Sequence, residues 1–113
     1  MGIPCTAVVE RLDPPELFEW FVDYRRSIGL NVVPVGPGAA AEVARAVKER
    51  HVVCLLSDRD VTGHGVEVEF FGERTTLPAG PAALALRTGT SLMPAAIYFQ
   101  KALRHGKMCA PLE

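Results

Sequence analysis

The sequence has little net charge and no long apolar segment, and each shortage excludes a class of protein. Lys and Arg total 12 against 13 Asp and Glu, which gives a formal net charge of −1 at pH 7. Such a balance lacks the basic field that neutralises nucleic acid phosphates, so nucleic acid is not expected as a partner. No stretch reaches the ~20 apolar residues of a membrane-spanning helix, and no basic region followed by an apolar one marks a secretory signal.

Cysteine is scarce as well. Cys5, Cys54 and Cys109 lie far apart and form no C-x-x-C pair. Neither a zinc site nor a disulfide framework is therefore expected, and no other metal site is predicted. Cys54 belongs to an apolar run, which predicts a small buried side chain.

What remains is the composition of one globular domain over residues 1–113. Hydrophobic residues make up 49% of the chain and charged residues 22%, enough to form a core. Apolar runs and helical periodicities alternate along the chain. They predict strands at 3–9, 31–35, 52–56, 66–70 and 91–99, and helices at 14–28, 40–50 and 80–88.

This order predicts an α/β fold, with a mostly parallel sheet and helices packed on it. Residues 52–56 are continuously apolar, so this strand is expected to be covered on both faces. Residues 100–107 are polar and turn-like, and 108–112 can begin a further strand. Because both ends of the chain fall on strand patterns, the domain is expected to be truncated at both ends.

A charged corner, Asp58-Arg59-Asp60, follows the strand at 52–56 directly. Open α/β sheets bind ligands at the carboxyl ends of their strands, where an Arg fixed between carboxylates can hold an imidazole or an anionic substrate. Alternatively, the corner is a solvated turn with an internal ion pair. Glu10 ends the first strand at the same edge, and Arg25 lies near the end of the first helix.

Three further patterns allow both a functional and a structural interpretation. His64 and Glu69 have the spacing of a base and its carboxylate, although His64 lies between glycines in a loop. Pro78-Ala79-Gly80-Pro81 opens a helix whose free amides can bind an anion, or it forms a simple cap. Phe70, Phe71 and Leu77 can line an apolar channel or belong to the core. His51 ends a helix and is expected to contact its C-terminus.

The series ERLDPPELFEWFVDYRRSIGLNVVPV, followed by VVCLLSDRDVTGHGVEVEFFGERTTLPAGPAALALRTGTSLMPAAIYF, resembles a known family. It is similar to the lipid A acyltransferase-like proteins of the lysophospholipid acyltransferase superfamily. Within that family it most resembles the phosphatidylinositol mannoside acyltransferases, and the resemblance covers nearly the whole chain.

The resemblance implies part of a glycerolipid acyltransferase-like fold. It also implies transfer of a fatty acyl group from acyl-CoA, or an acyl carrier protein, to a hydroxyl of a glycolipid such as a phosphatidylinositol mannoside. Peripheral contact with the cytoplasmic face of the cell membrane and the absence of a bound cofactor follow from the same resemblance.

By the same resemblance, Asp58, Glu10 and Arg25 support a catalytic His. Arg59 is expected to bind substrate, and Gly80 and Pro81 match the turn beside the acyl and headgroup site. Many relatives carry Glu where Asp58 stands.

The family's catalytic base is the His of an H-x-x-x-x-D/E motif that would precede Gly2. His51 and His105 have no acid five residues on, and His64 falls outside the matching part of the family pattern. The chain is therefore expected to be a central fragment that is inactive alone. The alternative is a non-catalytic lipid- or nucleotide-binding α/β module. A dinucleotide-binding domain is disfavoured because no G-x-G-x-x-G follows a strand.

Overall fold

The computed structural model describes residues 2–100 and 103–108. It contains a parallel sheet of three strands with the order β2-β1-β3. These strands are β1 (Cys5–Val9), β2 (Leu30–Pro34) and β3 (Val52–Cys54). Cys5 lies opposite Leu30 on one side and Val52 on the other, so both neighbours run parallel to the central strand. The α/β class and the parallel sheet are confirmed.

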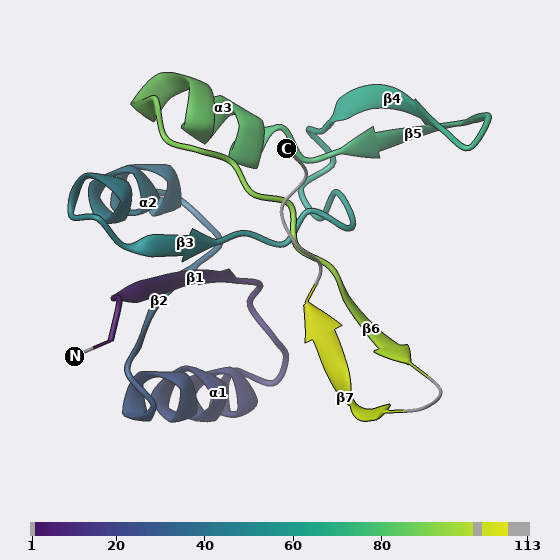
Figure 1. Cartoon of the computed structure of the whole chain (residues 1–113). Coiled ribbons are helices and arrows are strands. Elements are labelled where there is room, and N and C mark those ends of the chain that lie inside the picture. The colour runs from purple at the N-terminus through teal and green to yellow at the C-terminus, as the bar shows by residue number, and fades with distance from the viewer. Residues whose placement is uncertain (1, 101–102, 109–113) are drawn as a thin grey trace.

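Helices join the three strands and cover the two faces of the sheet (Figure 1). Helix α1 (Pro15–Ser27) lies on one face and α2 (Ala39–Lys48) on the other. Pro15 fits the first turn of α1 because its missing N–H would have no helical acceptor there. Gly29 follows α1 at φ 89°, as expected of a residue that ends a helix in the left-handed region.

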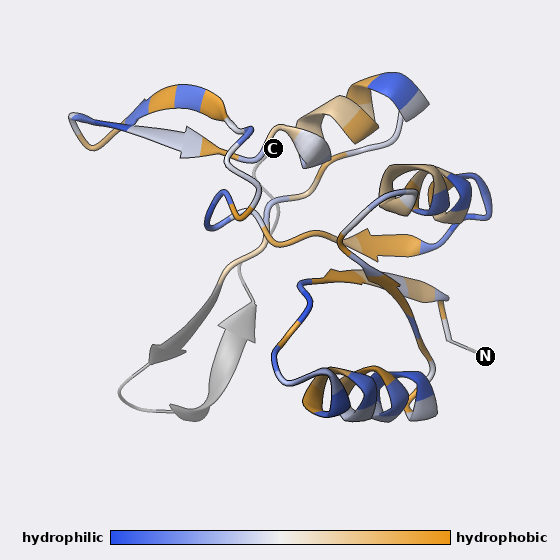
Figure 2. Cartoon of the chain, turned by 180° about the vertical axis from the view of Figure 1, so that it is seen from behind, coloured by the Kyte–Doolittle hydropathy of each residue, from blue (hydrophilic) through white to orange (hydrophobic). Residues whose placement is uncertain are grey.

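The core is small and consists mainly of valines. Val9, Val22 and Val32 form a buried cluster against which Phe18 and Leu30 pack. Val33, Val43 and Ala46 are also buried. Figure 2 shows apolar residues concentrated on β1 and β3, whereas apolar and polar residues alternate around α1.

Two antiparallel hairpins follow the sheet. Strands β4 (Val66–Phe70) and β5 (Glu73–Leu77) form the first, and β6 (Ile97–Gln100) and β7 (Leu103–Met108) form the second. Helix α3 (Gly80–Thr88) lies between the hairpins in sequence and contacts α2. Its bounds and the left-handed Gly89 at its end agree with the prediction.

Several predictions of strands are wrong. Residues 91–96 have no regular structure, and β6 belongs to a hairpin instead of a fourth parallel strand. β7 occupies most of the segment expected to be a turn, and 109–113 lie outside the described residues. Within residues 2–100 and 103–108 no fourth strand pairs with β3, which therefore lies at the edge of the sheet. Val52 is 50% exposed and Leu56 83%, so this strand is not covered on both faces.

Cys54 is exposed as well, contrary to the expectation of a buried side chain. Its Sγ lies 3.6 Å from Cys5 Sγ on the neighbouring strand. Partial burial and the nearby Cys54 thiol both raise the pKa of Cys5, burial being the larger cause. The two cysteines are therefore thiols in contact between the central strand β1 and the edge strand β3.

A polar network around the buried Thr6 side chain joins the three strands near their amino-terminal ends. Thr6 has no exposed surface, and its Oγ1 lies 2.8 Å from His51 Nδ1. Asn31 Nδ2 donates to the same oxygen at 3.1 Å. His51 thus contacts Thr6 and, through Nε2 at 3.8 Å, Glu49 in the α2–β3 turn. Its backbone N–H donates to the backbone O of Ala46 near the end of α2, while the interaction of its ring with the helix end stays a prediction.

Candidate functional site

The carboxyl edge of the sheet brings Glu10 and the charged corner together. Glu10 follows β1 and Asp58-Arg59-Asp60 follow β3, and the two strands are parallel neighbours. Both segments therefore leave the sheet at the same edge, beside hairpin β4–β5 (Figure 1). This is the edge at which the sequence predicted a site.

Arg59 and Glu10 form an ion pair across this edge. Arg59 Nη2 donates a hydrogen bond to Glu10 Oε2 at 2.6 Å. The side chains remain 67% and 47% exposed, so the pair contributes little to stability. Its effect is to fix the direction of the guanidinium.

The first pocket, of about 440 Å³, lies between the charged corner and hairpin β4–β5. The corner contributes Ser57, Asp58, Arg59 and Asp60, and the hairpin contributes Phe70, Thr75, Thr76 and Leu77. One wall is thus charged, and the other is apolar with two hydroxyl groups. Phe70 and Leu77 line this space as the channel interpretation expected, whereas Phe71 is 92% exposed at the hairpin turn.

The second pocket, of about 240 Å³, lies between the end of β1 and α1. Its walls are mainly apolar: Val8, Val9, Leu12, Phe18, Phe21, Val22 and Leu56. Glu10 and Arg25 are its two charged residues, and Arg25 Cζ lies 4.8 Å from the ring centroid of Phe21. This contact holds the guanidinium over an aromatic face.

The three residues expected to support a His are thus divided between adjoining pockets. Glu10 and Arg25 line the second pocket, and Asp58 lines the first. Glu10 connects the two because its carboxylate binds Arg59 on the wall of the first pocket. Their roles in catalysis remain a prediction.

Asp60, expected to help fix Arg59 within the charged corner, instead organises the loop after β3, while Arg59 binds Glu10. Asp60 Oδ1 accepts hydrogen bonds from the backbone N–H groups of Thr62 and Gly63 at 3.1 and 3.0 Å. Oδ2 accepts the backbone N–H of Gly65 at 2.8 Å. These bonds favour the carboxylate and, with the Gly65 bond as the largest cause, lower the pKa of Asp60 to about 2. The D-x-T-G spacing is the sequence signal for such a turn.

Gly65 allows this loop to close against the hairpin. A Cβ at this position would lie 2.6 Å from the backbone O of Leu77 and 2.7 Å from Asp60 Oδ2. Only glycine fits between these two atoms. Asp60 and Gly65 therefore hold the charged corner against β5 and give the first pocket its shape.

The remaining predicted residues lie apart from these contacts. His64 is exposed, and its backbone N–H donates to Thr62 Oγ1 at 3.4 Å. Gly80 and Pro81 begin α3, and a Cβ at Gly80 would meet nothing within 4 Å. The role of Gly80 in binding substrate stays a prediction, because the surroundings of this residue do not require a glycine.

No helix in the described residues is long and apolar enough to cross a membrane.

The arrangement of this edge is suited to binding and orienting polar groups. Asp58 presents a carboxylate, which can accept a hydrogen bond from an imidazole or a hydroxyl. Arg59 presents a fixed cation, which can bind a phosphate or a developing oxyanion. The adjoining apolar pocket can accept hydrocarbon.

Comparison with known proteins supports the family recognised in the sequence. Residues 2–111 match the family described as bacterial lipid A biosynthesis acyltransferase. The phosphatidylinositol mannoside acyltransferase of Mycobacterium tuberculosis is 44% identical over 98 residues, which are 84% of this chain and 31% of that protein. The enzyme of the same name from Mycolicibacterium smegmatis is 43% identical over 100 residues, which are 86% of this chain and 33% of that protein.

The chain thus spans about a third of the length of these relatives. The match includes the β1–β3 sheet, the charged corner and hairpin β4–β5, since the family match runs through all of them. The chain belongs to the bacterial lipid A biosynthesis acyltransferase family.

Proposed function

We propose that this chain is part of an enzyme that transfers a fatty acyl group from acyl-CoA to a hydroxyl of a phosphatidylinositol mannoside or a similar glycolipid. The acceptor class is supported by the names of two relatives that are 43% and 44% identical to the chain. The acyl-CoA donor and peripheral contact with the cytoplasmic face of the membrane are inferred from the family resemblance. No bound cofactor is proposed.

One observation carries the proposal. Arg59 is held by Glu10 at 2.6 Å and lines the first pocket beside Asp58. Acyl transfer needs a positive group where the thioester oxygen gains charge, and it needs a carboxylate that orients the base. Arg59 and Asp58 supply these two groups on one wall.

The reaction then follows a direct route. A His outside these 113 residues takes the proton of the acceptor hydroxyl, whose oxygen attacks the thioester carbonyl carbon. The C–S bond breaks, an ester C–O bond forms, and the CoA thiolate leaves and takes up the proton from the imidazolium. Asp58 orients the imidazole, while Glu10 acts indirectly by positioning Arg59.

Arg25, Gly80 and Pro81 have supporting roles in this proposal. Arg25 shares the second pocket with Glu10, where it stands over the Phe21 ring at the border of apolar space. Hydrocarbon of either substrate fits this pocket. Gly80 and Pro81 open α3, and the free backbone amides of its first turn would bind a polar headgroup.

The test restores the proposed base. A segment carrying the family's H-x-x-x-x-D/E motif is joined in front of Gly2, and transfer of a labelled acyl group from acyl-CoA to a phosphatidylinositol mannoside is measured. We expect transfer by the joined protein and none by residues 1–113 alone. A joined protein with its motif His changed to Ala serves as the control. Thioester cleavage by residues 1–113 alone would contradict the proposal.

A further inference from the structure

Cys5 and Cys54 bring two thiols into contact across neighbouring parallel strands. Cys5 lies opposite Val52 and Cys54 lies opposite Ala7, so the two cysteines are offset by two residues along β1 and β3. Side chains alternate between the faces of a sheet with a period of two, and this offset therefore places both sulfurs on one face. The two Sγ atoms are 3.6 Å apart. The strand register thus brings the thiols together.

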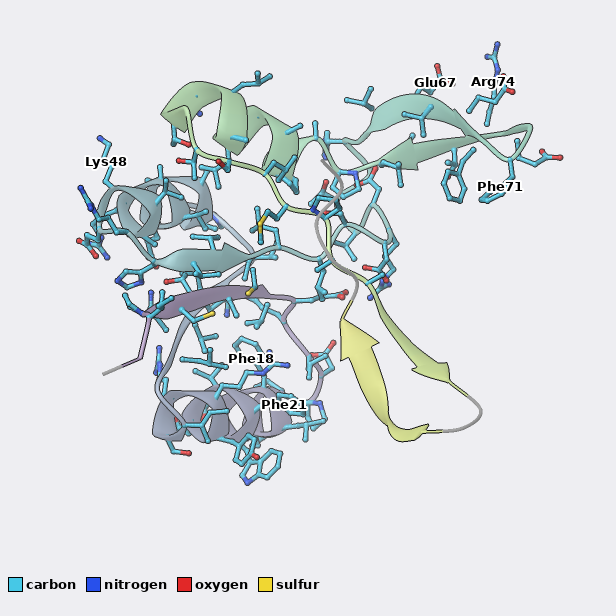
Figure 3. The ribbon with its side chains drawn as sticks, in the orientation of Figure 1. Phe18, Phe21, Lys48, Glu67, Phe71 and Arg74 are labelled. Atoms are coloured by element: carbon cyan, nitrogen blue, oxygen red, sulfur yellow. The ribbon has the colours of Figure 1, made fainter. Side chains whose placement is uncertain are left out.

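This face of the sheet is the one on which α1 packs. Cys5 and Val9 are four residues apart on β1, so they point to the same face. Val9 and Val22 belong to one buried cluster, against which Phe18 packs. Figure 3 shows Phe18 between α1 and the sheet. Because α1 contacts β2, the thiol of Cys54 on β3 stays exposed in the described part of the chain.

The two thiols differ in reactivity. Partial burial, and to a lesser extent the Cys54 thiol beside it, raises the pKa of Cys5, so Cys5 stays protonated. The thiolate is the form of cysteine that attacks a disulfide. Cys54 is therefore the thiol that reacts first, and Cys5 is the thiol that follows.

A small movement closes the gap between the sulfurs. A disulfide bond is about 2.05 Å long, which is roughly 1.5 Å less than the 3.6 Å between the two Sγ atoms. Strand β3 has three residues and pairs, among the described residues, with β1 alone. Rotation of the two side chains and a slight shift of this short edge strand supply the movement.

We infer that Cys5 and Cys54 form a redox modification site, which a low-molecular-weight disulfide closes into a bond between β1 and β3. The thiolate of Cys54 attacks one sulfur of the small disulfide, and the first small thiolate leaves and takes up the proton that Cys54 lost. Cys5 then loses its proton and attacks Cys54 Sγ, and the second small thiolate leaves and takes up that proton. The two cysteines lose two electrons, and the small disulfide is reduced to two thiols.

The bond joins the two strands that lead to the charged edge. Glu10 follows β1, and Asp58 and Arg59 follow β3. The oxidised pair thus fixes how β1 and β3 lie relative to each other ahead of the ion pair between Glu10 and Arg59. Neither cysteine is among the described residues that line the first or the second pocket. The inference therefore goes beyond the proposed function and does not depend on it.

The test maps the bond in the chain of 113 residues by mass spectrometry. The reduced protein is incubated with glutathione disulfide, the remaining thiols are blocked with N-ethylmaleimide, and the protein is digested with trypsin without reduction. Trypsin places Cys5 in peptide 1–11 and Cys54 in peptide 51–59. We expect these two peptides to be linked and dithiothreitol to separate them.

Cys109, which lies outside the described residues, provides the matched control. Cys109→Ser should keep the full yield of linked peptides, whereas Cys54→Ser should abolish the link. In urea the yield from the unmodified protein should fall about tenfold or more, because the fold no longer holds the two sulfurs together. This comparison needs no variant, so it tests the inference even if a substitution prevents folding.

The thermal stability of the unmodified protein provides a second measurement. The oxidised protein should have a Tm about 10 °C above that of the reduced protein, because the bond restricts the unfolded chain. An unchanged Tm would contradict a bond that joins β1 and β3 in the folded protein.

Three further outcomes would overturn the inference. The first is the absence of the linked peptides, including a mixed disulfide on Cys54 that does not pass to Cys5. The second is a link from either cysteine to Cys109 in place of the expected pair. The third is an equal yield in buffer and in urea, which would show that the fold does not bring the sulfurs together. Acyl transfer does not enter these measurements, so failure of the proposed function would leave their results unchanged.

Discussion

Arg59 Nη2 lies 2.6 Å from Glu10 Oε2 and joins the ends of two parallel neighbouring strands. Because both side chains are exposed, we expect a coupling free energy of about 0.2–1 kcal/mol between them. A double-mutant cycle of Glu10→Gln and Arg59→Gln in urea denaturation measures it. The ion pair therefore orients the Arg59 side chain and contributes little to the stability of the fold. A coupling free energy of several kcal/mol would contradict this conclusion.

Gly65 should tolerate no side chain. Gly65→Ala places a Cβ 2.6 Å from the Leu77 backbone O, so the loop or β5 must move. We expect the free energy of unfolding to fall by about 1–3 kcal/mol. Gly80→Ala is the matched control, because its Cβ meets nothing within 4 Å and should change stability by less than about 0.5 kcal/mol. Equal stability of the two variants would contradict the close approach at Gly65.

The thermal stability of the protein should depend on pH because the Asp60 carboxylate stabilises the loop after β3. The folded protein lowers the pKa of Asp60 from its ordinary 3.8 to about 2. The stabilisation is therefore fully present above pH 4 or so, and it is lost as the pH falls toward 2. Asp60→Asn should have a smaller loss of Tm over this interval than the unmodified protein. Asp13→Asn, in the exposed β1–α1 loop, is the control and should keep the original slope.

The buried hydroxyl of Thr6 should contribute to stability through its two partners. Thr6→Val keeps the shape but leaves His51 Nδ1 and Asn31 Nδ2 without the oxygen they contact. We expect a loss of about 1–3 kcal/mol in denaturant unfolding. Thr75→Val, on an exposed position of β5, should stay within about 0.5 kcal/mol. If Thr6→Val unfolds like the unmodified protein, the network has no structural role.

The sequence predicted the elements that depend on local signals. Pro15 and Gly29 mark the ends of α1, and α3 runs from Gly80 to Thr88 with the left-handed Gly89 after it, as expected. The edge that carries Glu10 and the charged corner was also predictable, because parallel strands end together.

What the sequence did not predict depends on contacts between distant segments. An apolar run such as 52–56 shows that a strand forms, yet its burial depends on whether another strand pairs with it. Similarly, the apolar pattern of α1 includes Trp20 and Tyr24, which face away from the sheet. Hydrophobic periodicity does not show which part of a wide apolar face is covered.

The sequence predicted which residues lie at the site, but it did not predict which of them contact one another. Asp58, Glu10 and Arg25 were predicted to act as one group, and Arg59 was assigned to the charged corner, but the contact of Glu10 with Arg59 needed the register of β1 and β3. Asp60 was assigned to the charged corner, but its part in the loop was not predicted because most of its partners are backbone N–H groups, which carry no side-chain signature.

The central claim is that the charged corner orients a base for acyl transfer. The most direct measurement compares acyl transfer to a phosphatidylinositol mannoside by the joined protein and by its Asp58→Asn variant. We expect the variant to lower kcat about a hundredfold or more with little change in Tm, because the imidazole loses its carboxylate. A kcat that Asp58→Asn leaves unchanged would contradict the account.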